Sequence, residues 1–310
     1  MQAAWMIAGA FFFASMAVGV KFASASYNAF EITFYRGIVG VFFMAWMARA
    51  NHVSLRTSVP LMHLWRNVVG VTALVFWFYA IAKLPLATAM TLNYMSGIWM
   101  AVFLVGGTLA TGSGADIRRQ GPLIAAVMFS FVGVVMMLRP TLGQNQLFAG
   151  LIGLLSGLMA ALAYMQVAAL GRLGEPEVRV VFYFSVGASL TGLIGMLCTG
   201  GAHAWRWPAA AWLLPIGVLA ALGQWSLTRA YTRGATMVVA NLQYSGIVFA
   251  ALYGLLLFHN PIAWMGWLGI ALIIASGIAA TVLRARALPA RPPEEIQTLP
   301  PCHNRCTPHS

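Results

Sequence analysis

Amide and aromatic side chains lie inside several long apolar stretches of this sequence. Polar groups are costly in lipid, so they usually face the interior of a helix bundle or a water-filled cavity. There, amide and hydroxyl groups can hold a solute by hydrogen bonds while aromatic rings stack on it. The alternative is that they form interhelical hydrogen bonds that only hold a bundle together. We predict that the following residues line a solute-binding cavity: Trp77, Tyr79, Asn93, Tyr94, Tyr164, Gln224, Trp225, Asn241, Gln243 and Tyr244.

Nothing in the sequence points to catalysis. A membrane-embedded enzyme would need a carboxylate dyad, a nucleophile with its base, or a metal set, and the apolar stretches contain none of these. There is also no Gly-rich phosphate loop followed by Lys. Cys302, His303, Cys306 and His309 lie close together, but no packed element flanks them to hold a tetrahedral metal site. We therefore predict no enzymatic activity, no cofactor and no metal.

Membrane-spanning helices must position the predicted cavity residues. The chain is 61% hydrophobic and only 8% charged, with a mean hydropathy of +0.82, whereas a soluble domain is about 25% charged. The net charge of +12 does not indicate nucleic-acid binding, because the basic residues lie mostly between apolar runs. The expected partners are the lipid bilayer and a small-molecule solute.

Ten apolar stretches are long enough to cross a bilayer, which takes about 17–25 mostly apolar residues. With the N-terminus inside, most of the 18 Lys and Arg residues fall in cytoplasmic segments, Arg66 among them. This predicts a multi-pass protein of the inner (plasma) membrane with both termini cytoplasmic. The ten stretches are Ala3–Val20, Ala29–Ala48, Leu64–Ala82, Leu86–Leu109, Gly121–Leu138, Ala149–Leu170, Val178–Thr199, Ala209–Thr228, Ala235–Phe258 and Ala263–Leu283.

The second stretch carries two charges near its start, Glu31 and Arg36. We interpret them as a pair at the membrane interface, with the long Arg36 side chain reaching outward to water. The alternative is a gate, or a contact from Arg36 to a carboxylate of a substrate.

The two halves of the chain resemble each other at an offset of 148 residues. The matches are Trp77 with Trp225, Asn93 with Asn241 and, after a slip of one residue, Ser96-Gly97-Ile98 with Ser245-Gly246-Ile247. Because each half has five stretches, an odd number, the second half must enter the membrane upside down. We predict an all-α membrane protein of two inverted five-helix repeats, residues 1–140 and 149–284, with a disordered cytoplasmic tail at residues 285–310.

These features resemble the drug/metabolite transporter superfamily, specifically its ten-helix EamA-type branch. The similarity covers about residues 3–283. It rests on FYRGIVG at Phe34–Gly40, on the run Trp77–Phe103 with its echo Trp225–Gly254, and on the closing segment Trp264–Thr281. The sequence departs from the family at Phe258-His259-Asn260-Pro261, where a Gly-Glu pair is common.

The resemblance implies export of a metabolite, an amino acid or a drug-like solute by alternating access between the two halves. A membrane scaffold or assembly factor without transport activity is the alternative function. A homodimer is an alternative to a monomer.

Overall fold

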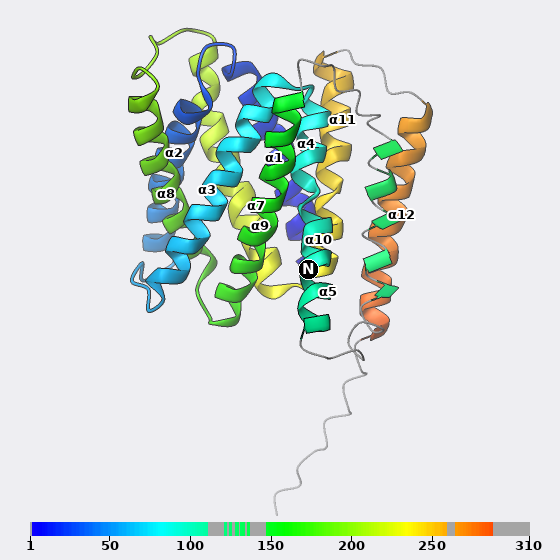
Figure 1. Cartoon of the computed structure of the whole chain (residues 1–310). Helices are drawn as coiled ribbons and strands as arrows, with labels where there is room; N and C mark the ends of the chain where they lie inside the picture. Colours follow the sequence, from blue (N-terminus) through cyan, green and yellow to red (C-terminus); the bar gives the residue numbers. More distant parts are fainter. Residues whose placement is uncertain are drawn as a thin grey trace, which may run out of the picture.

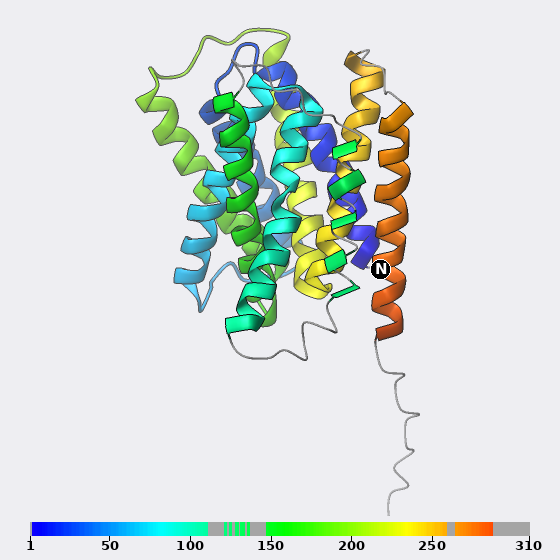
Figure 2. The ribbon, with the colours of Figure 1, turned by 45° about the vertical axis from the view of Figure 1, so that its right-hand side comes forward.

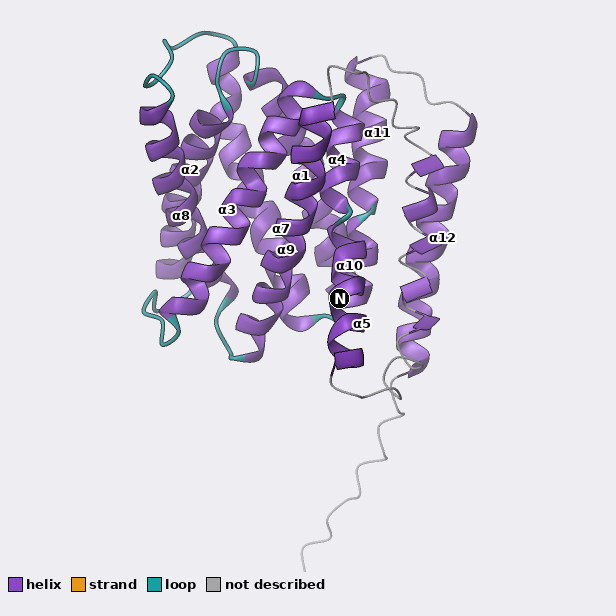
Figure 3. Cartoon of the chain, viewed as in Figure 1, coloured by secondary structure: helices purple, strands orange, loops and turns teal. Residues whose placement is uncertain are grey.

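The structure, a computed structural model, describes residues 2–110, 147–258 and 264–287, together with part of residues 121–136. Every regular element among these residues is helical, and the long helices run roughly side by side as one bundle (Figures 1 and 3). The prediction of an all-α protein is confirmed. The expected stretch Gly121–Leu138 is described only in part, and Cys302, His303, Cys306 and His309 lie outside the described residues.

The helices follow the expected stretches closely. Seven apolar stretches of the described residues are long enough to cross a membrane. α12 continues three residues beyond the predicted end of the second repeat, to Ala287. The helices are α1 Gln2–Ala23, α2 Ala29–Ala50, α3 Pro60–Lys83, α4 Leu86–Tyr94, α5 Ser96–Ala110, α7 Leu147–Arg172, α8 Glu177–Cys198, the 3-10 helix η2 Ala209–Trp212, α9 Leu213–Arg233, α10 Thr236–Gln243, α11 Ser245–Phe258 and α12 Trp264–Ala287.

Two of the expected stretches are each broken into a pair of shorter helices. α4 and α5 meet at Met95, and α10 and α11 meet at Tyr244. Each break is followed by the Ser-Gly-Ile run that the two halves share. Breaks free backbone groups from the helical hydrogen-bond ladder, and in membrane proteins they are tolerated where protein or a watery cavity surrounds them.

The broken helices touch each other through a reciprocal tyrosine–glycine contact. A Cβ atom on Gly97 would lie 2.9 Å from the hydroxyl of Tyr244, and a Cβ atom on Gly246 would lie 2.7 Å from the hydroxyl of Tyr94. Both distances are shorter than a Cβ atom tolerates, so the close approach requires glycine at both positions.

The two halves of the chain interleave instead of forming separate bundles. α1 packs on α9, α3 on α7, and α2 on α8, while α12 stands at the edge against α10 and α11 (Figure 2). Small residues allow the tight crossing of α2 and α8: Gly37 lies on Ser189, and Gly40 lies on Ser185. Small residues let helix backbones approach closely, which is the usual basis of helix association in lipid.

Candidate solute-binding cavity

A cavity lies where helices from both halves of the chain meet. Its volume is about 40 Å³, room for about three water molecules. A metabolite therefore needs the surrounding helices to move apart before it can enter. The lining residues are Phe13 of α1; Arg36 of α2; Arg66, Gly70, Ala73, Leu74 and Trp77 of α3; Asn93 and Tyr94 of α4; Ala160, Ala163 and Tyr164 of α7; Phe184 of α8; and Gln224 of α9.

Half of the predicted site residues line this cavity: Trp77, Asn93, Tyr94, Tyr164 and Gln224. Three of them present buried polar atoms that have no hydrogen-bond partner, namely the indole N–H of Trp77, the hydroxyl of Tyr94 and the amide nitrogen of Gln224. Burying a polar group without a partner is costly. These groups are therefore available to a bound solute.

The other five predicted residues lie outside the lining, and two of them form hydrogen bonds to neighbouring helices. Asn241 donates a hydrogen bond of 2.9 Å to the carbonyl of Ser276 on α12. Gln243 accepts one from Tyr231 at 3.1 Å and donates one of 3.4 Å to the hydroxyl of Tyr164. For Asn241 and Gln243 the structure thus favours the alternative of interhelical bonding, although Gln243 also orients a residue that lines the cavity.

The remaining three are aromatic residues that pack on other side chains. The ring of Tyr79 meets Phe148 edge-on. Trp225 meets Trp5 edge-on, with their ring centroids 5.1 Å apart. Tyr244 lies on Gly97 in the contact between the broken helices.

Two arginines line the cavity, and the interpretation of Arg36 from sequence was wrong. Arg36 does not reach outward to water: it is 5% exposed, and its Cζ lies 5.3 Å from the centre of the Phe184 ring. Arg66, which the sequence assigns to the cytoplasmic side, lies buried within α3: it is 2% exposed, and its Cζ lies 4.2 Å from the centre of the same ring. A sequence signal for Arg66 exists, because Gly70 is four residues further along the same helix face and leaves room for the guanidinium.

Glu31 does not neutralise Arg36, since its two carboxylate oxygens are used elsewhere. One accepts the backbone N–H of Asn28 at 2.8 Å and completes the capping box that starts α2. The same oxygen lies 2.8 Å from Nδ1 of His203, and the other accepts the backbone N–H of His203 at 2.6 Å. The carboxylate therefore joins the start of α2 to the loop of residues 199–208.

The cavity carries positive charge without an opposite charge beside it. Besides Glu31, the acidic residues that the structure describes are Glu175 and Glu177. Glu175 pairs with Arg179, and Glu177 pairs with Arg233. Within the described part of the chain, Arg36 and Arg66 make no ion pair. The Nε atoms of both, and Nη1 of Arg66, are buried without a hydrogen-bond partner. A buried charge without a partner is strongly unfavourable.

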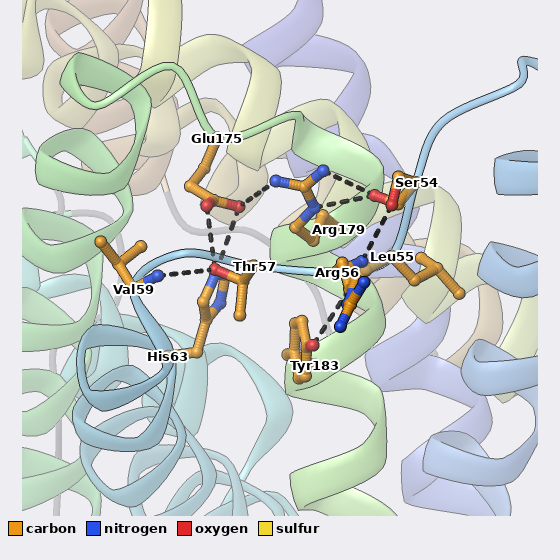
Figure 4. A network of polar contacts seen from close by, with 9 residues as sticks. All are labelled: Ser54, Leu55, Arg56, Thr57, Val59, His63, Glu175, Arg179 and Tyr183. Carbon is orange, nitrogen blue, oxygen red and sulfur yellow. Dashed lines mark hydrogen bonds and ion pairs between the residues drawn. The ribbon is translucent and has the colours of Figure 1, made fainter.

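A polar network around Glu175 joins the two halves at one end of the bundle, the lower end in Figure 1 (Figure 4). The carboxylate of Glu175 accepts a hydrogen bond of 2.9 Å from Thr57, pairs with Arg179 at 3.0 Å and lies 3.4 Å from Nε2 of His63. His63 precedes Arg66 by about one helical turn, so this Glu175 network lies next to the cavity.

The same network fixes the loop between α2 and α3 onto α8. Arg179 donates hydrogen bonds of 2.9 and 2.6 Å to the carbonyl of Ser54, and the hydroxyl of Tyr183 donates one of 3.0 Å to the carbonyl of Leu55. Burial opposes ionisation of Glu175, but the hydrogen bonds from Thr57 and Arg179 and the charge of Arg179 outweigh it and lower the pKa of this carboxyl. Glu175 is thus held ionised.

A second network joins the halves at the opposite end of the bundle, at the top of Figure 1. It comprises the contacts of Glu31 with His203, a hydrogen bond of 3.2 Å from the backbone N–H of Arg206 to the hydroxyl of Tyr27, and the edge-on contact of Tyr35 with Trp205. We call this the His203 network. The cavity residues on α2 and α3 thus lie between two sets of contacts that connect the first half to the second.

This chain is similar in sequence to known proteins over most of its length. Residues 1–106 match the EamA-like transporter family. The chain is 33% identical over 281 residues to the pseudopaline exporter CntI of Pseudomonas aeruginosa, a match that covers 89% of this chain and 92% of that one. The chain belongs to the EamA-like transporter family. This confirms the resemblance to EamA-type drug/metabolite transporters.

Further relatives are named as transporters as well. An uncharacterized transporter of Helicobacter pylori is 29% identical, with 86% of this chain and 89% of that one covered. A riboflavin transporter of Rhizobium johnstonii is 26% identical, with 78% and 77% covered. A solved crystal structure matches the fold with a TM-score of 0.72 at 16% identity, over 92% of this chain and 98% of that one. The protein is therefore a multi-pass inner-membrane transporter of small metabolites, and the alternative of a scaffold is not favoured.

Proposed function

We propose that this EamA-family transporter exports a small metabolite by alternating access, with the described cavity as its binding site. The observation that carries this proposal is the set of unpaired buried donors at the meeting point of the two halves. The pseudopaline exporter CntI, at 33% identity, supports the outward direction. The small present volume of the cavity corresponds to a state that has no room for a metabolite.

The moving parts are two inverted five-helix repeats, residues 1–140 and 149–284. Three observations support this arrangement. Both halves contain a broken helix, and the two breaks are joined by reciprocal tyrosine–glycine contacts. α1 packs on α9 as α3 packs on α7, which is the pairing that a two-fold axis between the repeats would produce. The offset of 148 residues also relates Tyr35 to Tyr183, and each of these lies in one of the two end networks.

The two networks act as alternate gates in this mechanism. With both termini cytoplasmic, the Glu175 network faces the cytoplasm and the His203 network faces outward. Opening the inner gate detaches the loop of residues 51–59 from α8, while the His203 network holds the outer end closed. Each hydrogen bond contributes about 0.5–1.5 kcal/mol, so a few such bonds suffice to make each closed state favourable while leaving it reversible.

Transport by the protein reconstituted in liposomes tests the proposal, with amino acids, organic acids, nucleosides and riboflavin as candidate solutes. Two neighbouring residues of α9 form a matched pair of variants. Gln224 lines the cavity, so Gln224→Ala is expected to lower the flux of the transported solute about tenfold, from the loss of one buried hydrogen bond. Trp225 lies outside the lining, so Trp225→Phe should transport like the native chain.

The amount of folded protein in the liposomes must be equal for the three chains. Native flux in Gln224→Ala would remove this cavity from the transport path. A flux lost in Trp225→Phe but kept in Gln224→Ala would place the path elsewhere in the bundle.

A further inference from the structure

We propose that the transported solute is an organic anion, and that Arg36 and Arg66 bind its carboxylate. The inference rests on the proposed transport through this cavity and adds the chemical class of the solute. Its basis is the charge of the cavity, the geometry of the two guanidiniums and the chemistry of the remaining lining.

The two guanidiniums lack the opposite charge that they need. Arginine stays protonated under all physiological conditions and offers five N–H donors in a planar fork. Both forks lie over the Phe184 ring, whose face attracts cations but carries no net charge. No carboxylate of the described residues reaches either of them. An anion in the cavity would balance both charges and satisfy the unpaired Nε and Nη1 atoms.

The geometry lets one ligand contact both arginines. The two Cζ atoms are at most 9.5 Å apart, which is the sum of their distances to the Phe184 centroid. A carboxylate binds a guanidinium through two parallel hydrogen bonds, and this fork-to-fork pairing is the strongest polar contact that the side chain makes. Within this distance a solute with two carboxylates can engage each fork separately, and a solute with one carboxylate can pair with one fork while the other lies close by.

The rest of the lining suits the carbon skeleton of an organic anion better than an inorganic one. Phe13, Tyr94 and Phe184 supply aromatic surface, while the Trp77 N–H and the Gln224 amide supply donors for neutral oxygens. A cationic solute would be repelled by both arginines. A neutral solute would leave the two charges unbalanced in a site from which it has displaced the water.

The site also connects the two halves that must move. Arg36 and Arg66 belong to the first half, and Phe184 belongs to the second. α2 and α8 approach closely where Gly40 lies on Ser185, next to Phe184. A bound anion would relieve the repulsion between the arginines and so favour a conformation in which both guanidiniums face a solute-filled cavity. This is the differential binding that a solute needs in order to drive a conformational change.

The test compares the small molecules that accumulate outside cells producing the native chain with those outside cells producing four variants. Arg36→Gln and Arg66→Gln remove the charges. Arg66→Lys keeps the charge but removes the fork. Arg229→Gln is the matched control, because Arg229 stacks on Trp5 and Trp225 and lies outside the cavity. Equal amounts of each chain in the membrane are verified.

We expect every solute whose external level depends on the native chain to carry a carboxylate. Its accumulation should fall about ten- to hundredfold in Arg36→Gln and Arg66→Gln, since a hydrogen bond to a charged group is lost. The fall should be smaller in Arg66→Lys and absent in Arg229→Gln. A solute with a phosphate but no carboxylate, a neutral or cationic solute, or unchanged export by both glutamine variants would overturn the inference and leave the transport proposal intact. The absence of any solute that depends on the native chain would refute the transport proposal itself.

Thermal unfolding of the purified variants without solute separates binding from a structural role. If the arginines serve the solute, removing an unbalanced buried charge should leave the unfolding temperature unchanged or raise it. A clear fall in unfolding temperature in both glutamine variants would instead show that the arginines stabilise the fold.

Discussion

Replacing Gly70 by alanine should displace Arg66 without unfolding the protein. A Cβ atom at this position would overlap the Nη1 atom of Arg66 and lie 3.2 Å from Cε2 of Phe184. The overlapping atom is the far end of a flexible side chain, so Arg66 can swing away. Phe184 needs to move by only a few tenths of an ångström.

The magnitude follows from two opposing effects. Alanine is favoured over glycine in a helix interior by about 1 kcal/mol, and Gly70 lies well inside α3. Crowding of Arg66 and Phe184 costs about 1–3 kcal/mol if the neighbours cannot relax, and less if Arg66 leaves. The two effects nearly cancel, so the change in unfolding free energy should stay within about 1 kcal/mol. Transport should nevertheless fall about tenfold, because the guanidinium no longer reaches the solute.

The assay measures thermal unfolding of the purified protein and solute flux for the same preparation. Gly254→Ala on α11 is the control, because a Cβ atom there meets nothing within 4 Å. The control should keep native flux and gain a little stability. Native flux in Gly70→Ala would refute the role assigned to the position of Arg66. A large loss of stability would show that Arg66 cannot leave its place on the Phe184 ring.

Three further predictions concern the fold. Gly246→Ala should lower the unfolding temperature, because its Cβ would lie 2.7 Å from the Tyr94 hydroxyl and overpacking costs about 1–3 kcal/mol; Tyr94→Phe in the same chain should restore part of the loss. The pKa of Glu175 is lower in the folded protein than in the unfolded chain. The ionised Glu175 carboxylate should therefore stabilise the protein fully above its unfolded pKa of about 4.3. This stabilisation should disappear as the pH falls through the folded pKa. Glu175→Gln should remove that part of the pH dependence, measured as unfolding temperature between pH 3 and pH 6, and an unchanged profile would contradict it. Cysteines replacing Arg118 and Arg139 should be labelled from opposite sides of the membrane, and labelling from the same side would rule out five helices in the first half.

The gating proposal depends on Glu175 and Glu31 having corresponding tasks at the two ends. Each carboxylate is buried and accepts hydrogen bonds from both halves of the chain. Glu175 accepts them from Thr57 and Arg179, and Glu31 accepts them from the backbone N–H groups of Asn28 and His203. Each carboxylate therefore connects one half of the chain to the other at its own end of the bundle. They leave Arg36 and Arg66 as the cavity charges without an acidic partner among the described residues.

The sequence by itself determined the class of the protein. The length and polarity of each apolar stretch decide whether it crosses a bilayer, and both are local properties that need no tertiary information. The expected stretches therefore match the observed helices closely, and the family resemblance carried by Trp77–Phe103 and its echo is confirmed.

Only the tertiary structure decided which side chains face the cavity. A helix surrounded by lipid and other helices is apolar on nearly every side, so its periodicity does not reveal which face is the inner one. Gln224 and Trp225 are adjacent in the sequence and both are predicted to line the cavity, yet only Gln224 does so. From sequence, Arg36 is expected at the membrane interface and Arg66 on the cytoplasmic side, because each lies near the start of an apolar stretch. The packing of α2 and α3 against Phe184 of α8 turns both inward, and that packing joins residues more than a hundred positions apart.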